Sequence, residues 1–165
     1  MRRLGLLTGL LVASTVLSLR AQPSQAASGN AATPSAEGAI VPDDLVVREM
    51  LKTPHGLPES EVRESLRHCD GNNTQMKVCA AYQWTVQDIR LNRVYAKALA
   101  AAQDAGTASA LIKAQRSWLA YRDTECAFEG ARGAGGGTLE GLYVLDCKES
   151  LTKQQADRLD GGAGQ

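Results

Sequence analysis

The residues best placed to do chemistry in this sequence lie within one amphipathic segment, Leu111 to Cys126. When the segment is drawn as an α-helix with about 100° per residue, polar side chains fall among apolar ones on the face that should meet the core. A charged side chain on such a face needs ion-pair and hydrogen-bond partners, because burying an unpaired charge is costly. The segment therefore predicts a structural polar network or a binding site. The residues concerned are Gln115, Trp118, Arg122 and Glu125.

The predicted network needs an acidic partner for Arg122. Glu125 lies one turn further along the same helix, and Asp88 flanks an apolar stripe on the preceding helical segment. Asn92 can complete the hydrogen bonds across the helix pair. One interpretation is a buried network that fixes the register of the helices, and the other is a polar groove that accepts a partner's side chain. We favour the structural interpretation, in which truncating Arg122 strands a carboxylate.

The sequence gives little support to catalysis. Asp123 and Glu125 are two residues apart on a helix, so they face different directions and cannot form the carboxylate pair of a hydrolase. Asp123 and Arg116 are expected on a solvated face. His55 and His68 have no recognisable nucleophile arrangement, and the run of three glycines lacks the strand and lysine of a phosphate loop. We therefore predict that the protein is not an enzyme and holds no metal or cofactor.

The N-terminus has the pattern of a secretory signal peptide over residues 1–26. A basic start precedes an uncharged apolar run from Leu4 to Leu19, and a small-residue stretch follows. Cleavage is expected after Ala26, with Ala27 as the alternative site. The apolar run is shorter than the roughly 20 residues of a membrane span, and no other segment predicts one. We expect a soluble periplasmic or secreted protein.

Signal removal changes the charge balance. The full chain has 18 basic and 18 acidic residues, and the three arginines Arg2, Arg3 and Arg20 leave with the signal. The mature chain therefore carries a net charge near −3. This mild acidity gives no reason to expect nucleic acid or an anionic membrane surface as a partner.

All four cysteines, Cys69, Cys79, Cys126 and Cys147, lie in the exported part. An even count in a small secreted domain predicts disulfides, with three possible connectivities. Zinc is disfavoured because no two cysteines have CxxC spacing and both histidines precede all four. In an antiparallel hairpin of helices, Cys126 and Cys147 lie at heights that differ by only about 5 Å. That pairing leaves Cys69 with Cys79, across the turn at residues 70–73.

Helical signals dominate the rest of the chain. A flexible linker is expected at 27–42, one helical domain at 43–160, and a disordered tail at 161–165. The fold predicted is an all-α, disulfide-bonded bundle with two long antiparallel helices and shorter flanking ones. Two short helices are expected first, one from Asp43 or Asp44 to Lys52 and one after Pro58. A long helix over 75–105 is expected next, capped by Thr74 and ended by Gly106, and a second long helix runs from Thr107 or Ser109 to 131. A last helix begins at Leu139, with a break or kink near Leu151.

Several motifs together resemble the LprI-like lysozyme-inhibitor family of bacterial secreted and envelope proteins, over about residues 69–159. The resemblance implies a small helical, disulfide-bonded domain of the bacterial envelope. The family takes its name from a member that inhibits lysozyme. This chain lacks the lipid-modified cysteine of the lipoprotein members. The motifs are Cys79-Ala-Ala, Leu91-Asn92-x-x-Tyr95, Ala114-Gln115-Arg116-x-Trp118-x-x-Tyr121-Arg122-Asp123-x-Glu125-Cys126, a Gly-Gly-Thr138 loop, Cys147 and Leu151-Thr152.

The glycine-rich stretch after the second long helix is the candidate contact with a partner. Its simpler interpretation is a flexible helix–helix connector. In the functional interpretation, the loop and its cation enter the cleft of a muramidase, which contains two working carboxylates. The function predicted is inhibition of lysozyme or a related muramidase by cleft occlusion; the alternative is an envelope adaptor that binds another protein. The candidate contacts are Arg132, Gly135, Gly136, Gly137 and Thr138.

Overall fold

The computed structural model describes residues 43–53 and 56–162, which all belong to one of the two compact units of the chain, residues 34–165. The expected signal peptide and linker, and residues 163–165, lie outside the described residues. Within the described part the structure has five helices and no strand, which confirms the predicted all-α class. The helices are α1 (Asp44–Leu51), α2 (Glu59–Ser65), α3 (Asn73–Asp104), α4 (Ala108–Ala134) and α5 (Glu140–Gly162).

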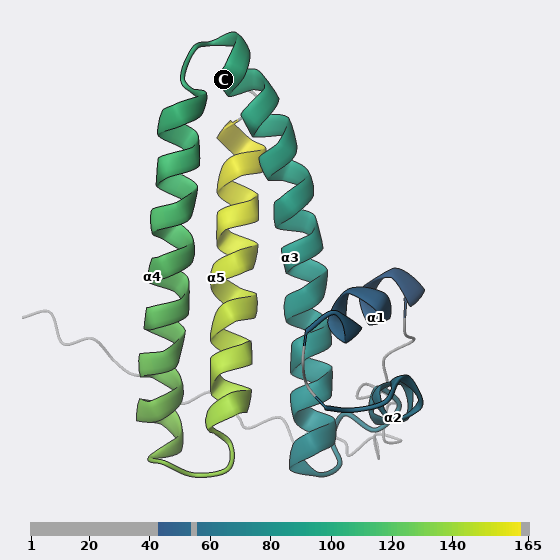
Figure 1. Cartoon of the computed structure of the whole chain (residues 1–165). Helices are drawn as coiled ribbons and strands as arrows, with labels where there is room; N and C mark the ends of the chain where they lie inside the picture. Colours follow the sequence, from purple (N-terminus) through teal and green to yellow (C-terminus); the bar gives the residue numbers. More distant parts are fainter. Residues whose placement is uncertain (1–42, 54–55, 163–165) are drawn as a thin grey trace, which may run out of the picture. The chain divides into compact units, whose positions relative to one another are not determined.

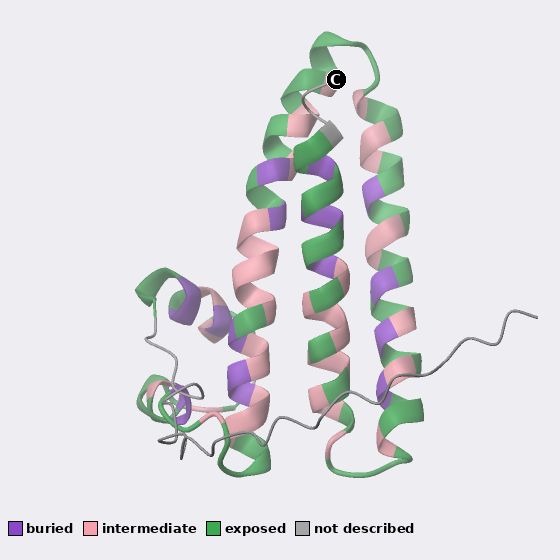
Figure 2. Ribbon diagram, turned by 180° about the vertical axis from the view of Figure 1, so that it is seen from behind, coloured by how far each residue is buried: buried purple, intermediate pink, exposed green. Residues whose placement is uncertain are grey.

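Three of these helices are long. In Figure 1, α5 lies between α3 and α4, and the view from behind in Figure 2 shows the same order. Short connections join α3 to α4 and α4 to α5, so α4 runs antiparallel to both. The two short helices, α1 and α2, pack against the N-terminal half of α3. No helix in the described ranges is both long enough and apolar enough to cross a lipid bilayer.

The last helix differs from the sequence expectation. α5 is continuous, so a break near Leu151, one of the two alternatives expected there, does not occur. That expectation came from Thr152 and Gln155 as a capping box, but both side chains are buried and form hydrogen bonds with α4. Tertiary contacts therefore use the polar groups that could have ended the helix. Gly161 and Gly162, which were expected in a disordered tail, belong to this helix.

The first long helix also begins differently from the expectation. Asn72, not Thr74, is its N-cap: the Asn72 side chain accepts hydrogen bonds from the backbone N–H groups of Thr74 and Gln75, at 2.9 and 3.1 Å. The Gln75 side chain accepts one in return from the Asn72 backbone N–H at 2.9 Å, which completes a capping box. Gly71 leaves room for this arrangement, because a Cβ there would lie 1.9 Å from Gln75 Oε1.

Both predicted disulfides are present. Cys69 and Cys79, with Cα atoms 5.6 Å apart, connect the segment after α2 to α3. Cys126 and Cys147, 5.4 Å apart, connect α4 to α5. Both bonds lie in the half of the bundle that contains the start of α3 and the α4–α5 turn: one fastens the segment after α2 to α3, and the other fastens α4 to α5.

The buried apolar residues form two clusters, and Figure 2 shows buried residues of all kinds in purple, where the short helices meet α3 and along all three long helices. One lies where α1 and α2 cover α3, and the other lies where α3 and α5 meet, with Leu111 and Trp118 of α4 packed against it. The first consists of Val46, Val47, Met50, Val62, Leu66, Val78, Cys79 and Tyr82, and the second of Leu91, Val94, Ala156 and Leu159. The polar residues of the candidate site lie between these clusters along α3.

Candidate functional site

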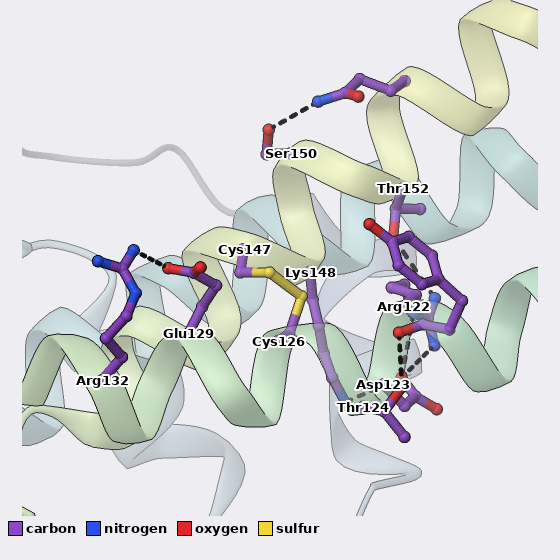
Figure 3. Close-up of a disulfide and its surroundings, with 12 residues drawn as sticks. Arg122, Asp123, Thr124, Cys126, Glu129, Arg132, Cys147, Lys148, Ser150 and Thr152 are labelled. Carbon is purple, nitrogen blue, oxygen red and sulfur yellow. Dashed lines mark hydrogen bonds and ion pairs between the residues drawn. A yellow bond between two sulfur atoms is a disulfide. The ribbon is translucent and has the colours of Figure 1, made fainter.

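A single buried guanidinium connects the three long helices. Arg122 of α4 is only 6% exposed. Its Nη1 lies 3.6 Å from Asp88 Oδ1 on α3 and donates a hydrogen bond to Thr152 Oγ1 on α5 at 3.4 Å. Its Nε and Nη2 both donate to Asp123 Oδ1, at 3.1 and 3.0 Å. Figure 3 shows this group beside the Cys126–Cys147 disulfide.

Two tryptophan rings flank the same guanidinium. Its central carbon lies 5.7 Å from the ring centroid of Trp84 on α3 and 5.4 Å from that of Trp118 on α4. Lys148 of α5 adds a second cation, 4.9 Å from the Trp84 ring and 3.4 Å from Asp123 Oδ1. Such contacts stabilise a desolvated cation, because the ring face carries negative charge density. The arrangement therefore solvates two cations with aromatic rings and carboxylates in place of water.

The structure brings together most of the residues named from sequence. Asn92 Nδ2 donates to Asp88 Oδ2 at 3.1 Å, so Asn92 supports the carboxylate that faces Arg122. Gln115 forms a separate buried pair with α5, because its Oε1 accepts a hydrogen bond from Gln155 Nε2 at 2.8 Å. Glu125 is half-buried and is not among the carboxylates that bind Arg122 in the described part of the chain.

Asp123 has partners that the sequence did not predict. It is exposed, as expected, as is Arg116, but its carboxylate binds both Arg122 and Lys148. Adjacent residues on a helix point in different directions, so helical periodicity alone gives no reason to pair them. The arginine side chain is long enough to reach the carboxylate of its neighbour while its guanidinium also contacts the rings of Trp84 and Trp118.

Trp84, Lys148 and Thr152 complete the Arg122 cluster, and Gln155 forms the separate pair with Gln115. The sequence did not single out these four as site residues. Trp84 belongs to the apolar stripe of α3, where a tryptophan looks like ordinary core. Thr152 and Gln155 carried a sequence signal, their spacing as a capping box, but that signal predicted a helix start. Their burial on the face of α5 that meets α4 is what makes them network residues.

Within the Arg122 cluster, the pKa of Asp123 is shifted from its ordinary value. Partial burial alone would raise the pKa of Asp123, but hydrogen bonds and charge from Arg122 and then Lys148 outweigh it, and the pKa lies below its ordinary value. A lowered pKa of an acid means that its stabilising effect is complete above the ordinary pKa, about 3.9. That effect disappears as the pH falls through the lower pKa of the folded state.

We therefore expect Asp123→Asn to reduce the free energy of unfolding at pH 7 by only about 0.5 kcal/mol, because this carboxylate is half-exposed. The difference from the wild type should shrink as the pH falls below about 4. Urea unfolding at several pH values between 7 and 2 measures this difference. A difference that stays constant to pH 2 would show that the Asp123 charge is not involved.

Close packing of α4 on α5 surrounds the second disulfide. Gly130, one turn after Cys126, is buried, and a Cβ there would lie 2.4 Å from Val144 Cγ2. Gly133 lies beneath the ring of Tyr143, whose Cγ would be 3.2 Å from an added Cβ. The two glycines therefore let the helices approach closely. Gly133 lies within α4, which extends past residue 131, where this helix was expected to end.

The glycine loop is shorter than the sequence suggested. α4 continues through Ala134, and Gly135 and Gly136 adopt positive φ angles of 55° and 81° that favour glycine. Thr138 Oγ1 accepts a hydrogen bond from Asn73 Nδ2 at 2.8 Å, so the loop is tied to the start of α3. The connection is therefore a compact turn rather than a long flexible one.

The candidate contact cation lies on the helix before that loop. Arg132 is exposed and forms an ion pair with Glu129, one turn earlier on α4. The outer face of the same helix carries two exposed aromatic side chains, Tyr121 at 51% and Phe128 at 60% exposure. Phe128 is four residues before Arg132, so the two are neighbours on the helix surface. An exposed aromatic beside an arginine is typical of protein-binding surfaces.

The described residues offer no cluster of three or more metal-ligating side chains. The carboxylates of the Arg122 cluster are held by cations, which suits structural stabilisation rather than proton transfer. What the described surface does present is a turn and a helix end with an arginine and a phenylalanine, features that can bind another protein.

Comparison with known proteins gives a consistent picture. The model of a family described as "Lysozyme inhibitor LprI" matches residues 68–159. An uncharacterized protein of Rhizobium meliloti (strain 1021) is 32% identical over 114 residues, which cover 62% of this chain and 78% of that protein. No solved structure gives a significant match. The matched region extends from the first disulfide to the end of the second core cluster.

Proposed function

Because this chain belongs to the LprI family of lysozyme inhibitors, we propose that it is an exported protein that binds a lysozyme or related muramidase and blocks its substrate cleft. The family match over α3, α4 and α5 carries this proposal. An inhibitor needs a rigid scaffold and a surface that fits the cleft. The disulfides and the Arg122 cluster supply the scaffold, since they fix the three long helices relative to one another.

The contact surface we propose is the end of α4 with the turn that follows. It contains Arg132, Gly135, Gly136, Gly137 and Thr138, extended along α4 by Phe128. Muramidase clefts carry two carboxylates, which an arginine can bind in a bidentate manner. The ion pair of Arg132 with Glu129 is exposed, and exposed pairs contribute at most about 1 kcal/mol. Arg132 can therefore exchange this partner for a carboxylate of the enzyme.

The geometry of the turn favours binding. Ordering a flexible loop costs affinity, and a connection made only of mobile glycines would lose much of its binding energy in this way. Here the Asn73–Thr138 hydrogen bond holds the turn to the start of α3, and the Cys126–Cys147 disulfide joins the two helices that the turn connects. The net charge near −3 after signal removal also favours encounter with a basic enzyme.

Titration of the mature, oxidised protein against several lysozymes tests this function. We expect a stoichiometric fall in muramidase turnover. Arg132→Ala should weaken inhibition by at least about tenfold, as loss of a charge-assisted contact does in a protein interface. Arg116→Ala, which removes another exposed arginine of α4, should leave inhibition unchanged, and both variants should keep the wild-type circular dichroism spectrum.

Two results would count against the proposal in different ways. Undiminished turnover of every muramidase at excess protein would refute inhibition, and recovery of a different cross-linked partner would then support the adaptor alternative. Equal inhibition by the wild type and by Arg132→Ala would refute only the contact surface.

A further inference from the structure

A second feature of the structure shares no lining residue with the contact surface proposed above. A cavity of about 430 Å³ lies beside α3, between the short helices and the start of α5. Its volume falls in the range of small-molecule binding sites, about 300–1,000 Å³. Apolar side chains from four helices and one connecting segment form most of its wall: Met50, Leu57, Val62, Val78, Ala81 and Leu145.

The polar side chains of this cavity are three threonine hydroxyls, which can donate and accept hydrogen bonds, and two groups that can only donate, the ammonium group of Lys77 and the indole of Trp84. Lys77 is the one charged side chain among the described lining residues, and none of the ion pairs in the described part of the chain involves it. A ligand that contacts the Lys77 ammonium group therefore needs an acceptor group.

The position of Lys77 favours a negative charge. Its Cε and Nζ lie 3.4 and 3.6 Å from where a Cβ of Gly141 would be, so the side chain crosses to the first turn of α5. The N-terminus of a helix carries a partial positive charge that adds to that of the ammonium group, although Glu140 in the first turn of α5 offsets part of it. The apolar wall continues away from this point along α3 toward Ala81 and Val78.

We propose that this cavity binds a single-chain amphiphile with an anionic head, such as a free fatty acid. Lys77 holds the anionic head, and the acyl chain lies in the apolar part between α3 and the short helices. A neutral apolar ligand would leave the Lys77 ammonium group without a partner, which costs affinity when water is excluded. A small anion such as acetate would leave the apolar wall unfilled. Only a ligand with both features fits the whole cavity.

Isothermal titration calorimetry of the mature, oxidised protein with dodecanoate tests this site. We expect saturable binding of one molecule per chain below the concentration at which dodecanoate forms micelles. Lys77→Gln should weaken dodecanoate binding by about tenfold and change binding of 1-dodecanol much less, because only the anion forms an ion pair with the ammonium group. Lys97→Gln, which removes an exposed charge further along α3, should have no effect on either ligand.

Filling the cavity provides the second variant. Ala81→Phe places a ring in the apolar part and should abolish binding of both ligands, while thermal unfolding shows that the variant remains folded. Lysophosphatidylglycerol, titrated in parallel, shows whether the head can also be the phosphate of a lipid. The absence of saturable dodecanoate binding, or equal binding by Ala81→Phe and the wild type, would overturn the proposal.

Discussion

Replacing Cys126 and Cys147 together with alanine is expected to lower the free energy of unfolding by about 3 kcal/mol. The bond joins residues 21 apart in sequence, so its loss frees the α4–α5 hairpin in the denatured state. Cys126 is fully buried where Gly130 lets the two helices approach closely, so alanine also leaves a small void. Urea denaturation of the oxidised double variant and wild type measures the difference.

Two controls make this result specific. The paired variant Cys69→Ala/Cys79→Ala removes a bond between residues only 10 apart, so its entropic effect should be smaller. Hydrogen exchange should show its effect mainly in α1 and α2, which pack at that end of α3. Treating the wild type with reductant breaks both disulfides, so its free energy of unfolding should fall as it does in each of the two paired variants. Equal stability of the Cys126/Cys147 variant and the oxidised wild type would contradict the prediction.

Arg122→Ala is expected to cost about 2–4 kcal/mol of unfolding free energy, the range for large-to-small changes in a core. The guanidinium fills the space between Trp84 and Trp118. Its loss leaves a cavity there and removes the hydrogen bond that Arg122 donates to Thr152. Arg122→Met, which keeps the volume, should lose less. Arg122→Lys should fall between them, because an ammonium cannot stack as a planar group between the rings.

The source of this cost differs from the sequence expectation that truncation strands a carboxylate. The side chains of Asp88 and Asp123 are 40% and 52% exposed, so water can solvate both once Arg122 is gone. A double-mutant cycle of Arg122→Ala with Asp88→Asn should therefore give a coupling energy below about 1 kcal/mol. A coupling as large as the whole effect of Arg122→Ala would show that the ion pair dominates. Arg116→Ala, on the exposed surface of α4, should change stability by no more than about 0.5 kcal/mol.

Local signals in the sequence were sufficient for the class of fold and for the covalent framework. Helical periodicity, the turn before α3 and Gly106 at its end determine where the helices form, because these signals act over one or two turns. The even cysteine count and the heights of Cys126 and Cys147 on adjacent antiparallel helices predicted both disulfides, since a helix has a fixed rise per residue. The same periodicity placed Arg122 on a buried face and so required partners for it.

Only the tertiary structure decided which partners those are. Asp123 joins the cluster because the Arg122 side chain reaches its carboxylate, and Trp84 joins it because α3 and α4 meet there; neither fact follows from spacing along one helix. Thr152 and Gln155 illustrate the same limit, because a local rule assigned them to a helix start while burial between helices gave them to the network. The cavity beside Lys77 likewise exists only where four helices meet. Local sequence determines the secondary structure of each segment, whereas the packing of the helices determines which side chains from distant parts of the chain come into contact.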